Sequence, residues 1–407
     1  MFSSKLSFIL TAVGAAVGLG NVFRFPYLAM KYGLAFVLVY VIFLCALGLP
    51  MLLSEIAYGR RFCGRAPGRR AAFSSKFCAF NSLFIFGYYT LLTALVLLAA
   101  FWSAGGDFSA LSSLSEGRYK DGFGLPLLFL AFSFAAVLFC FGDAERIGKI
   151  STVSVILSLL VLFLLALFRA TAAPEALSPL FRLDFSYLSA GEFWFDALSQ
   201  VFFSLSIAIG VLTAYGGLLK GTESIVSCGI YIAAVDLAVS LLAAVIYATV
   251  GGRAEGLFDS FSVYPSAFFE LGTAGAFLCF LFYTALGFLC LDSVVSFLKS
   301  SVVLIYPKFI KKEGTAAVIL TLSAAVFALF LLFFGAKESI AFLDGKITPT
   351  LILLGGLSLT LLFSKREVFD GVTDELGLGK MKATFKVLLR LFAPIFILLL
   401  LFAQIFF

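Results

Sequence analysis

Long apolar runs, separated by short polar stretches, repeat along the whole chain. A helix needs about 20 apolar residues to cross the hydrocarbon core of a bilayer, and the runs have this length. The pattern therefore predicts an all-α integral membrane protein with 11 transmembrane helices. The predicted spans are 7–30, 35–58, 81–104, 124–141, 148–168, 193–218, 225–250, 274–300, 315–335, 346–363 and 385–406.

Two of these runs are interrupted by glycines and polar residues. Residues Gly14 to Pro26 contain three glycines, an Asn and an Arg, and residues Gln200 to Gly210 contain two serines. An interior Gly costs about 1 kcal/mol of helix stability relative to Ala, and non-helical backbone at membrane depth occurs only where it lines a cavity. We therefore expect both helices to open midway, with carbonyl groups free for a cation and N–H groups free for an anion.

The two interrupted spans are the first and the sixth, five helices apart. Interrupted helices in matching positions of two halves are typical of an inverted repeat. We therefore expect one domain, 1–407, built as a five-plus-five inverted repeat. The halves cover about 1–168 and 193–363, and the helix at about 385–406 is appended.

Composition narrows the class of protein. The chain is 62% hydrophobic and 13% charged, whereas soluble domains are about 25% charged. It has no His, which excludes His-based zinc sites and Ser-His or Cys-His nucleophile pairs. We expect no enzyme and no nucleic-acid partner, and the seven Cys residues contain no Cys-x-x-Cys pair.

The distribution of positive charge predicts the orientation. Most of the 29 Lys and Arg residues fall in alternate loops, which the positive-inside rule places in the cytoplasm. The N-terminus is then cytoplasmic and the C-terminus outside, in the inner (plasma) membrane. A cleavable signal peptide is the alternative for the first run, but Asn21, Arg24 and Pro26 in it are unlike such a peptide.

Five segments together resemble the neurotransmitter sodium symporters, in the compact eleven-helix form found in bacteria. The segments are Gly14–Pro26, Pro50–Arg60 with Glu55 inside it, Tyr88–Tyr89, Gln200–Gly210 and Leu289–Ser293. The resemblance covers nearly the whole chain. It implies a secondary active transporter in which sodium drives uptake of an amino acid across the lipid bilayer.

The resemblance also implies two sodium sites. Acidic residues inside membrane spans are costly and are typical of ion pathways. Asp236 and Asp292 each lie inside a predicted span, and the resemblance assigns one of them to each sodium site. Implied ligands of the first sodium are Ala16, Asn21, Ser204 and Asp236, with the substrate carboxylate. Implied ligands of the second are Gly14, Val17, Leu289, Asp292 and Ser293.

Asp236 departs from the family, which commonly has Asn at this position. Residues that correspond to Tyr40, Gln200, Ser204 and Ser240 hold chloride in the chloride-dependent members. Our hypothesis is that Asp236 supplies the negative charge instead, because a cation in low dielectric needs a nearby anion, so chloride is not expected. A protonated Asp236 is the alternative, and it would allow proton antiport.

The substrate is expected between the two breaks. Gly18 stands where monoamine-type relatives have an Asp, so the resemblance favours an amino acid over an amine. The implied wall is mostly apolar, which favours a neutral hydrophobic or aromatic amino acid. The implied substrate contacts are Ala16, Gly18, Gly20, Ile85, Tyr89, Phe203, Ser204, Ser206, Ile209, Ser293 and Phe297.

The resemblance further implies gates on both sides. Arg24 and Asp344 correspond to an outer ion pair, and we expect Glu55 to accept freed N–H groups of the opened first helix. The inner gate departs from the family, since Phe2 stands where a Trp is typical and Pro307 falls near the expected acid. Inner closure is then expected to use other contacts or packing alone.

Two other functions remain open at this point. An ion channel would need a continuous polar pore, whereas the intramembrane polar residues here cluster at one depth. A transporter of another small zwitterion would use the same groups. A membrane enzyme would need a nucleophile and base pair, which the sequence does not offer.

Overall fold

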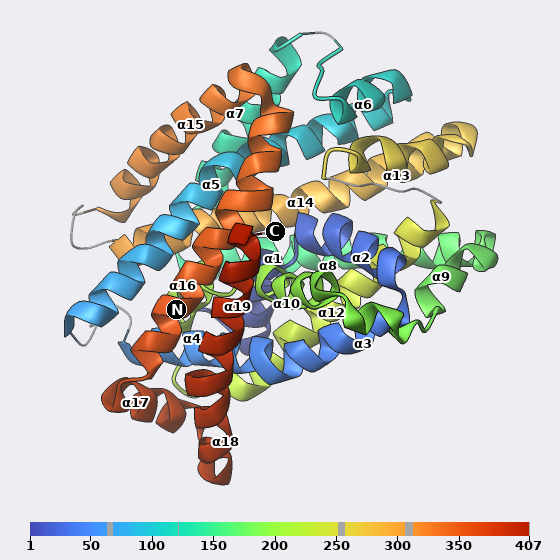
Figure 1. Ribbon diagram of the computed structural model, residues 1–407. Coiled ribbons are helices and arrows are strands. Elements are labelled where there is room, and N and C mark those ends of the chain that lie inside the picture. The colour runs from blue at the N-terminus through green and yellow to red at the C-terminus, as the bar shows by residue number, and fades with distance from the viewer. Residues whose placement is uncertain (63–67, 121, 251–256, 306–311, 407) are drawn as a thin grey trace.

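The computed structural model describes residues 1–62, 68–120, 122–250, 257–305 and 312–406, and these residues form helices and turns without any strand (Figure 1). The first half contains α1 (Lys5–Ala16), η1 (Gly20–Arg24), α2 (Phe25–Tyr32), α3 (Leu34–Phe43), η2 (Leu44–Gly48), α4 (Leu49–Phe62), α5 (Gly68–Ala104), α6 (Phe108–Ser115), α7 (Gly124–Cys140) and α8 (Ala144–Ala172).

The second half begins after α8. It contains η3 (Pro174–Leu177), α9 (Ser178–Phe181), η4 (Phe185–Ser189), α10 (Gly191–Ser204), α11 (Val211–Gly216), α12 (Ile225–Thr249), α13 (Ser260–Phe269), α14 (Gly272–Ile305), α15 (Glu313–Phe342), η5 (Leu343–Ile347), α16 (Thr348–Phe363), α17 (Arg366–Leu376), η6 (Gly379–Met381), α18 (Lys382–Val387), η7 (Leu388–Phe392) and α19 (Ala393–Phe406).

Each predicted span consists mostly of helical residues. Within the described ranges, seven helices are long and apolar enough to cross a membrane, or eight when the bent pair Lys5–Ala16 and Gly20–Tyr32 counts as one span. The count of eleven spans and the inverted repeat stay predictions. The polar stretches between the spans contain the short helices α6, α9, α13 and α17.

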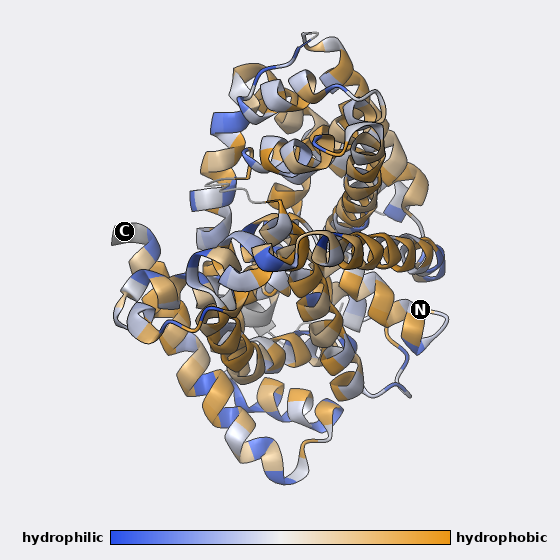
Figure 2. Ribbon diagram, turned by 90° about the vertical axis from the view of Figure 1, so that its right-hand side faces the viewer, coloured by the Kyte–Doolittle hydropathy of each residue, from blue (hydrophilic) through white to orange (hydrophobic). Residues whose placement is uncertain are grey.

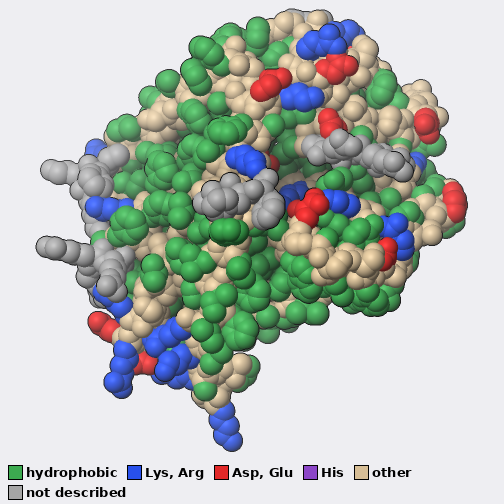
Figure 3. Space-filling model, in the orientation of Figure 1, with side chains coloured by type: hydrophobic (Ala, Val, Ile, Leu, Met, Phe, Trp, Pro, Cys, Tyr) green, Lys and Arg blue, Asp and Glu red, His purple; other side chains and the backbone are tan. Residues whose placement is uncertain are grey.

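The outer surface of the helices is apolar, as a lipid environment requires. On α15, Leu322, Val326 and Phe334 are 62%, 70% and 74% exposed. Hydrophobic residues predominate along most of the helices of the molecule (Figure 2). Charged side chains gather around α17 and α18 and again at the opposite end of the molecule (Figure 3). This arrangement fits a multi-pass membrane protein with polar ends in water.

Both predicted interruptions are present. α1 ends at Ala16, Val17 has extended backbone, and the chain axis turns by 65° before α2. α10 ends at Ser204, and Ser206, Ala208 and Gly210 follow with φ of 51°, 64° and 94°. A non-glycine residue in this left-handed region costs about 1–3 kcal/mol, so such backbone persists only where its surroundings hold it.

The broken helices lie inside the bundle. α1 packs against α8, α12 and α14, while α11 packs against α4 and α14. The long helices α5 and α14 run side by side, so α5 lies behind the helix that packs against α1 and α11 (Figure 1). The two breaks are therefore surrounded by continuous helices.

Candidate functional site

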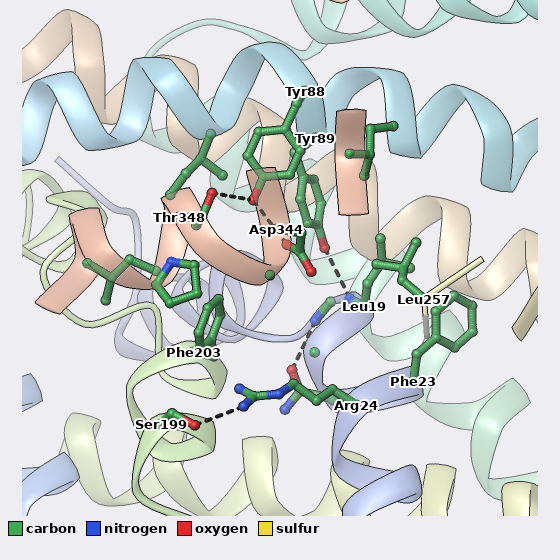
Figure 4. A pocket seen from close by; sticks show the side chains of 18 of the residues that line it. Leu19, Phe23, Arg24, Tyr88, Tyr89, Ser199, Phe203, Leu257, Asp344 and Thr348 are labelled. Atoms are coloured by element: carbon green, nitrogen blue, oxygen red, sulfur yellow. Dashed lines mark hydrogen bonds between the residues drawn. The ribbon is translucent and has the colours of Figure 1, made fainter. Parts of the chain in front are cut away.

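A cavity of about 590 Å³ lies between the two helix breaks (Figure 4). Ligand pockets typically measure about 300–1,000 Å³, so its size suits a small molecule. Of the eleven residues predicted to contact substrate, Ser204 alone does not line it. The ten that do are Ala16, Gly18, Gly20, Ile85, Tyr89, Phe203, Ser206, Ile209, Ser293 and Phe297.

The first break meets α5 at Tyr89. The Leu19 backbone N–H donates to the Tyr89 hydroxyl at 3.0 Å. A Cβ atom at Gly18 would lie 2.3 Å from the same hydroxyl oxygen, so the close approach of the two helices requires glycine here. The absence of a side chain leaves the backbone of the break open toward the cavity.

Aromatic rings line the cavity wall. The Phe297 ring packs edge-on against Tyr89, with centroids 5.6 Å apart, and the Arg24 guanidinium lies 5.1 Å from the centre of the Phe203 ring. Ser206, in the second break, donates to the Ala15 carbonyl at 3.1 Å. This bond ties the second break directly to the last turn of α1.

A buried polar cluster joins the first break to α12. The Asn21 amide nitrogen lies 2.8 Å from Ser204 Oγ, 2.8 Å from Asp236 Oδ1 and 2.9 Å from Ser240 Oγ. Ser204 also donates to Asp236 Oδ2 at 2.5 Å, and Tyr40 reaches the same oxygen at 3.4 Å. Three of the predicted ligands of the first sodium thus contact one another, beside Ala16 in the cavity wall.

Gln200 of α10 contacts the first break. Its amide nitrogen donates to the Gly20 carbonyl at 3.0 Å. Its Oε1 is buried without a hydrogen-bond partner among the described residues. One of the two amide N–H groups of Gln200 therefore binds the first break.

A second buried cluster surrounds Asp292 on α14. Ser293 Oγ lies 2.9 Å from the Gly14 carbonyl oxygen, 3.4 Å from that of Val17 and 3.1 Å from that of Leu289. All five predicted ligands of the second sodium therefore lie together, since a Cβ at Gly14 would approach Asp292 Oδ2 to 3.2 Å.

Two serines of α8 belong to this second cluster and were not predicted. Ser151 donates to Asp292 Oδ1 at 3.0 Å, and Ser154 donates to Asp292 Oδ2. Their signal in the sequence is their spacing of three residues within an apolar run, which places both on one helix face.

The two predicted outer-gate residues line the same cavity but do not pair in this structure. Arg24 lies 3.7 Å from Asp196 Oδ1 and donates to Ser199 at 2.8 Å, while Asp344 accepts from the Tyr88 hydroxyl at 3.1 Å. Figure 4 shows Arg24 and Asp344 on opposite sides of the cavity. Asp196 was not among the predicted site residues.

The expected role of Glu55 needs correction. Its carboxylate accepts the Ala208 backbone N–H at 2.6 Å and the Thr213 hydroxyl at 3.3 Å. It therefore supports the break between α10 and α11, not the one after α1. The reason is that the left-handed turn at Ala208 frees an N–H group that faces α4.

The inner end of α1 is closed by packing around Phe2. This ring is 1% exposed and packs edge-on against Phe8 and Tyr215, with centroids 5.4 and 5.5 Å apart. Its backbone N–H donates to the Leu218 carbonyl at 3.2 Å. Pro307 lies outside the described residues.

Sequence comparisons agree with this site. The model of the Sodium:neurotransmitter symporter family matches residues 1–103 and 124–407. An uncharacterized sodium-dependent transporter of Methanocaldococcus jannaschii is 28% identical over 81% of this chain and 73% of its own length. The sodium-dependent neutral amino acid transporter B(0)AT1 of Mus musculus is 27% identical over 63% of this chain and 47% of its own. The chain thus spans about half the length of the mouse protein.

A solved structure is similar along the whole chain. The crystal structure of MhsT in complex with L-phenylalanine superposes with a TM-score of 0.84 and 25% sequence identity, covering 100% of this chain and 99% of that one. Together with the family match over both halves, this similarity leaves little of the chain unaccounted for. The chain is a member of the sodium:neurotransmitter symporter family, a family of sodium-dependent secondary transporters and not of enzymes.

Proposed function

We propose that this protein is a symporter that uses the sodium gradient to import a neutral, hydrophobic or aromatic amino acid by alternating access. The observation that carries the proposal is the meeting of two opened helices and two buried carboxylates, Asp236 and Asp292, beside one cavity. Buried carboxylates within membrane spans mark ion pathways. We place the N-terminus in the cytoplasm, in agreement with the distribution of Lys and Arg.

The substrate carboxylate is proposed to bind at the first break. N–H groups of opened helix turns carry partial positive charge and suit an anion, and the Tyr89 hydroxyl lies beside them. The side chain of the substrate would lie among Ile85, Phe203 and Phe297, which are apolar. Such a wall supports an amino acid without a charged side chain.

The sodium ions are co-substrates, and the two buried clusters offer them oxygen atoms, which hard cations prefer. In the first cluster Asn21 Oδ1 accepts the Gly18 N–H at 3.1 Å, and the amide nitrogen faces Asp236. A sodium at this position would need the amide to turn its oxygen inward. In the second cluster the carbonyl groups of Gly14, Val17 and Leu289 already face one point beside Ser293.

Coupling follows from a shared contact. If the first sodium touches the carboxylate of the amino acid, each ligand raises the affinity for the other by the same factor. The free energy of the sodium gradient then drives accumulation of the amino acid. If the affinity for the amino acid is the same with and without sodium, the two ligands are not coupled and the protein cannot transport in this way.

Chloride is not part of the proposal. Asp236 supports this view because its charge lies within hydrogen-bond distance of Asn21 and Ser204. The Gln200 amide, which corresponds to a chloride donor in the chloride-dependent members, gives one of its two N–H groups to the Gly20 carbonyl.

The test is uptake by purified protein in sealed vesicles. We expect saturable accumulation of radiolabelled Leu, Phe or Trp with sodium outside, and none with potassium in its place. Replacing chloride by gluconate is expected to leave uptake unchanged. Amino acid flux that neither saturates nor exceeds equilibrium would favour a channel and contradict the proposal.

A further inference from the structure

The Arg24 guanidinium lies between two carboxylates that come from different parts of the chain. Asp196 of α10 lies 3.7 Å from its Nη2, and Asp344 of η5 lines the opposite side of the same cavity. Arg24 Nη1 is buried and has no hydrogen-bond partner among the described residues. One of its two nitrogen ends is therefore available for a second acceptor.

Asp196 is held firmly on the Arg24 side. Its Oδ2 accepts from the Tyr32 hydroxyl at 2.9 Å and lies 3.8 Å from the Lys31 ammonium. Ser199, one turn along α10, accepts from Arg24 at 2.8 Å. Asp196 and Ser199 therefore hold the Arg24 guanidinium against α10, on one wall of the cavity.

Asp344 lies on the other side of the cavity from Arg24 (Figure 4). Among the described residues it has no ion pair, and its contact is the Tyr88 hydroxyl at 3.1 Å. A carboxylate without a cation and a guanidinium with a free nitrogen attract one another across the cavity between them. Narrowing of the cavity would bring them together.

We propose that Asp196 is a positioning residue that competes with Asp344 for Arg24 and thereby holds the outer side of the cavity open. Closure then transfers the guanidinium from Asp196 to Asp344. The inference rests on the proposed transport function, because it assigns Asp196 a place in alternating access.

The transfer of Arg24 from Asp196 to Asp344 explains how a ligand with a small preference for the closed conformation closes the cavity. One ion pair is replaced by another of the same chemistry, so the two conformations differ by a small free energy. A ligand shifts such an equilibrium by its differential affinity for the two states. An arginine with a single carboxylate partner would instead fix one conformation.

The test measures access to the cavity directly. Ala341 is exposed on α15 and lines the cavity, so an Ala341→Cys variant reports opening through its rate of reaction with a membrane-impermeant thiol reagent. The assay uses full-length protein in choline buffer without sodium or amino acid. Labelling of the parent chain, which carries its native cysteines, is subtracted.

Asp196→Asn is expected to slow the labelling about threefold, the effect of losing one partly exposed ion pair. Asp196→Glu keeps the charge and is expected to label near the original rate. The double variant Asp196→Asn/Asp344→Asn removes both competitors, so its labelling should return toward the original rate. Asp344→Asn alone should not slow labelling.

The matched control is Asp107→Asn, which removes a carboxylate at the start of α6. The Lys120 ammonium hydrogen-bonds Asp107 and holds the pKa of that carboxyl below its ordinary value. Asp107 is not among the residues that line the cavity, so this variant should label at the original rate. An equal slowing by Asp107→Asn, or an unchanged rate in a folded Asp196→Asn variant, would overturn the inference.

Failure of the inference and failure of the proposed function are distinguishable. The labelling assay contains no transported substrate, so it responds to cavity opening alone. Sodium-dependent uptake with unchanged labelling in Asp196→Asn would remove the role of Asp196 and keep the symporter. Slower labelling of Asp196→Asn in a protein without sodium-dependent uptake would keep the role of Asp196 in cavity opening and contradict the symporter function.

Discussion

Glu55 of α4 accepts the backbone N–H of Ala208 at 2.6 Å, and Asn81 of α5 donates to the carbonyl of the same residue at 3.2 Å. Ala208 has φ of 64°, which a residue with a side chain rarely adopts. Both of its peptide groups are thus held by side chains from other helices. These two contacts stabilise the second break in the form that lines the cavity.

Glu55→Ala is expected to lower the free energy of unfolding by about 1–3 kcal/mol, the cost of leaving the buried Ala208 N–H without an acceptor. Glu55→Gln retains an amide oxygen in the same place and should lose less. The measurement is the thermal unfolding midpoint of purified protein in detergent. Equal losses in the two variants would show that the hydrogen bond at Ala208 does not hold the break.

The positions of the two breaks could be predicted from the sequence, because glycines and polar residues within apolar spans are costly unless they line a cavity. The hydrogen-bond partners of the buried side chains could not be predicted from the sequence. Glu55 was assigned to the first break, and Ser154 was not connected with Asp292. Such contacts depend on the rotation of each helix about its axis, which an apolar run on all faces leaves open.

Gly18 and Gly20 offer a matched pair of substitutions. Gly18→Ala places a methyl group 2.3 Å from the Tyr89 hydroxyl oxygen, whereas a Cβ at Gly20 meets nothing within 4 Å. We expect Gly18→Ala to lower the free energy of unfolding by about 1–3 kcal/mol through overpacking. Gly20→Ala should raise it slightly, by up to about 1 kcal/mol, since Ala favours helix over Gly.

A double variant tests the cause of the Gly18→Ala effect. Gly18→Ala combined with Tyr89→Phe removes the hydroxyl oxygen that the methyl group would meet, so the double variant should recover part of the lost stability. Thermal unfolding again gives the comparison. A double variant as unstable as the sum of the two single variants would locate the clash elsewhere.

Ser154→Ala is expected to raise the sodium concentration for half-maximal uptake several-fold. The serine hydroxyl donates to Asp292, and loss of this bond, worth about 1 kcal/mol, leaves the carboxylate less firmly oriented toward Gly14 and Ser293. Ser158→Ala is the control, because Ser158 lies on the same helix but donates to the Ala285 carbonyl at 3.0 Å. The same shift in both variants would assign the effect to α8 packing and not to Asp292.

Asp236→Asn tests whether a protein carboxylate takes the place of chloride. Hydrogen bonds to a charged group contribute about 1.5–3 kcal/mol, so uptake in gluconate should fall about tenfold or more when the charge is removed. Added chloride should restore part of this loss, because the hydroxyl groups of Tyr40 and Ser204, which reach Asp236 at 3.4 and 2.5 Å, become free to donate to an anion. Uptake is measured with sodium gluconate and sodium chloride side by side. If the variant transports equally well in both salts and at the original rate, Asp236 does not supply the balancing charge, and the negative charge beside the first sodium must come from the substrate carboxylate alone.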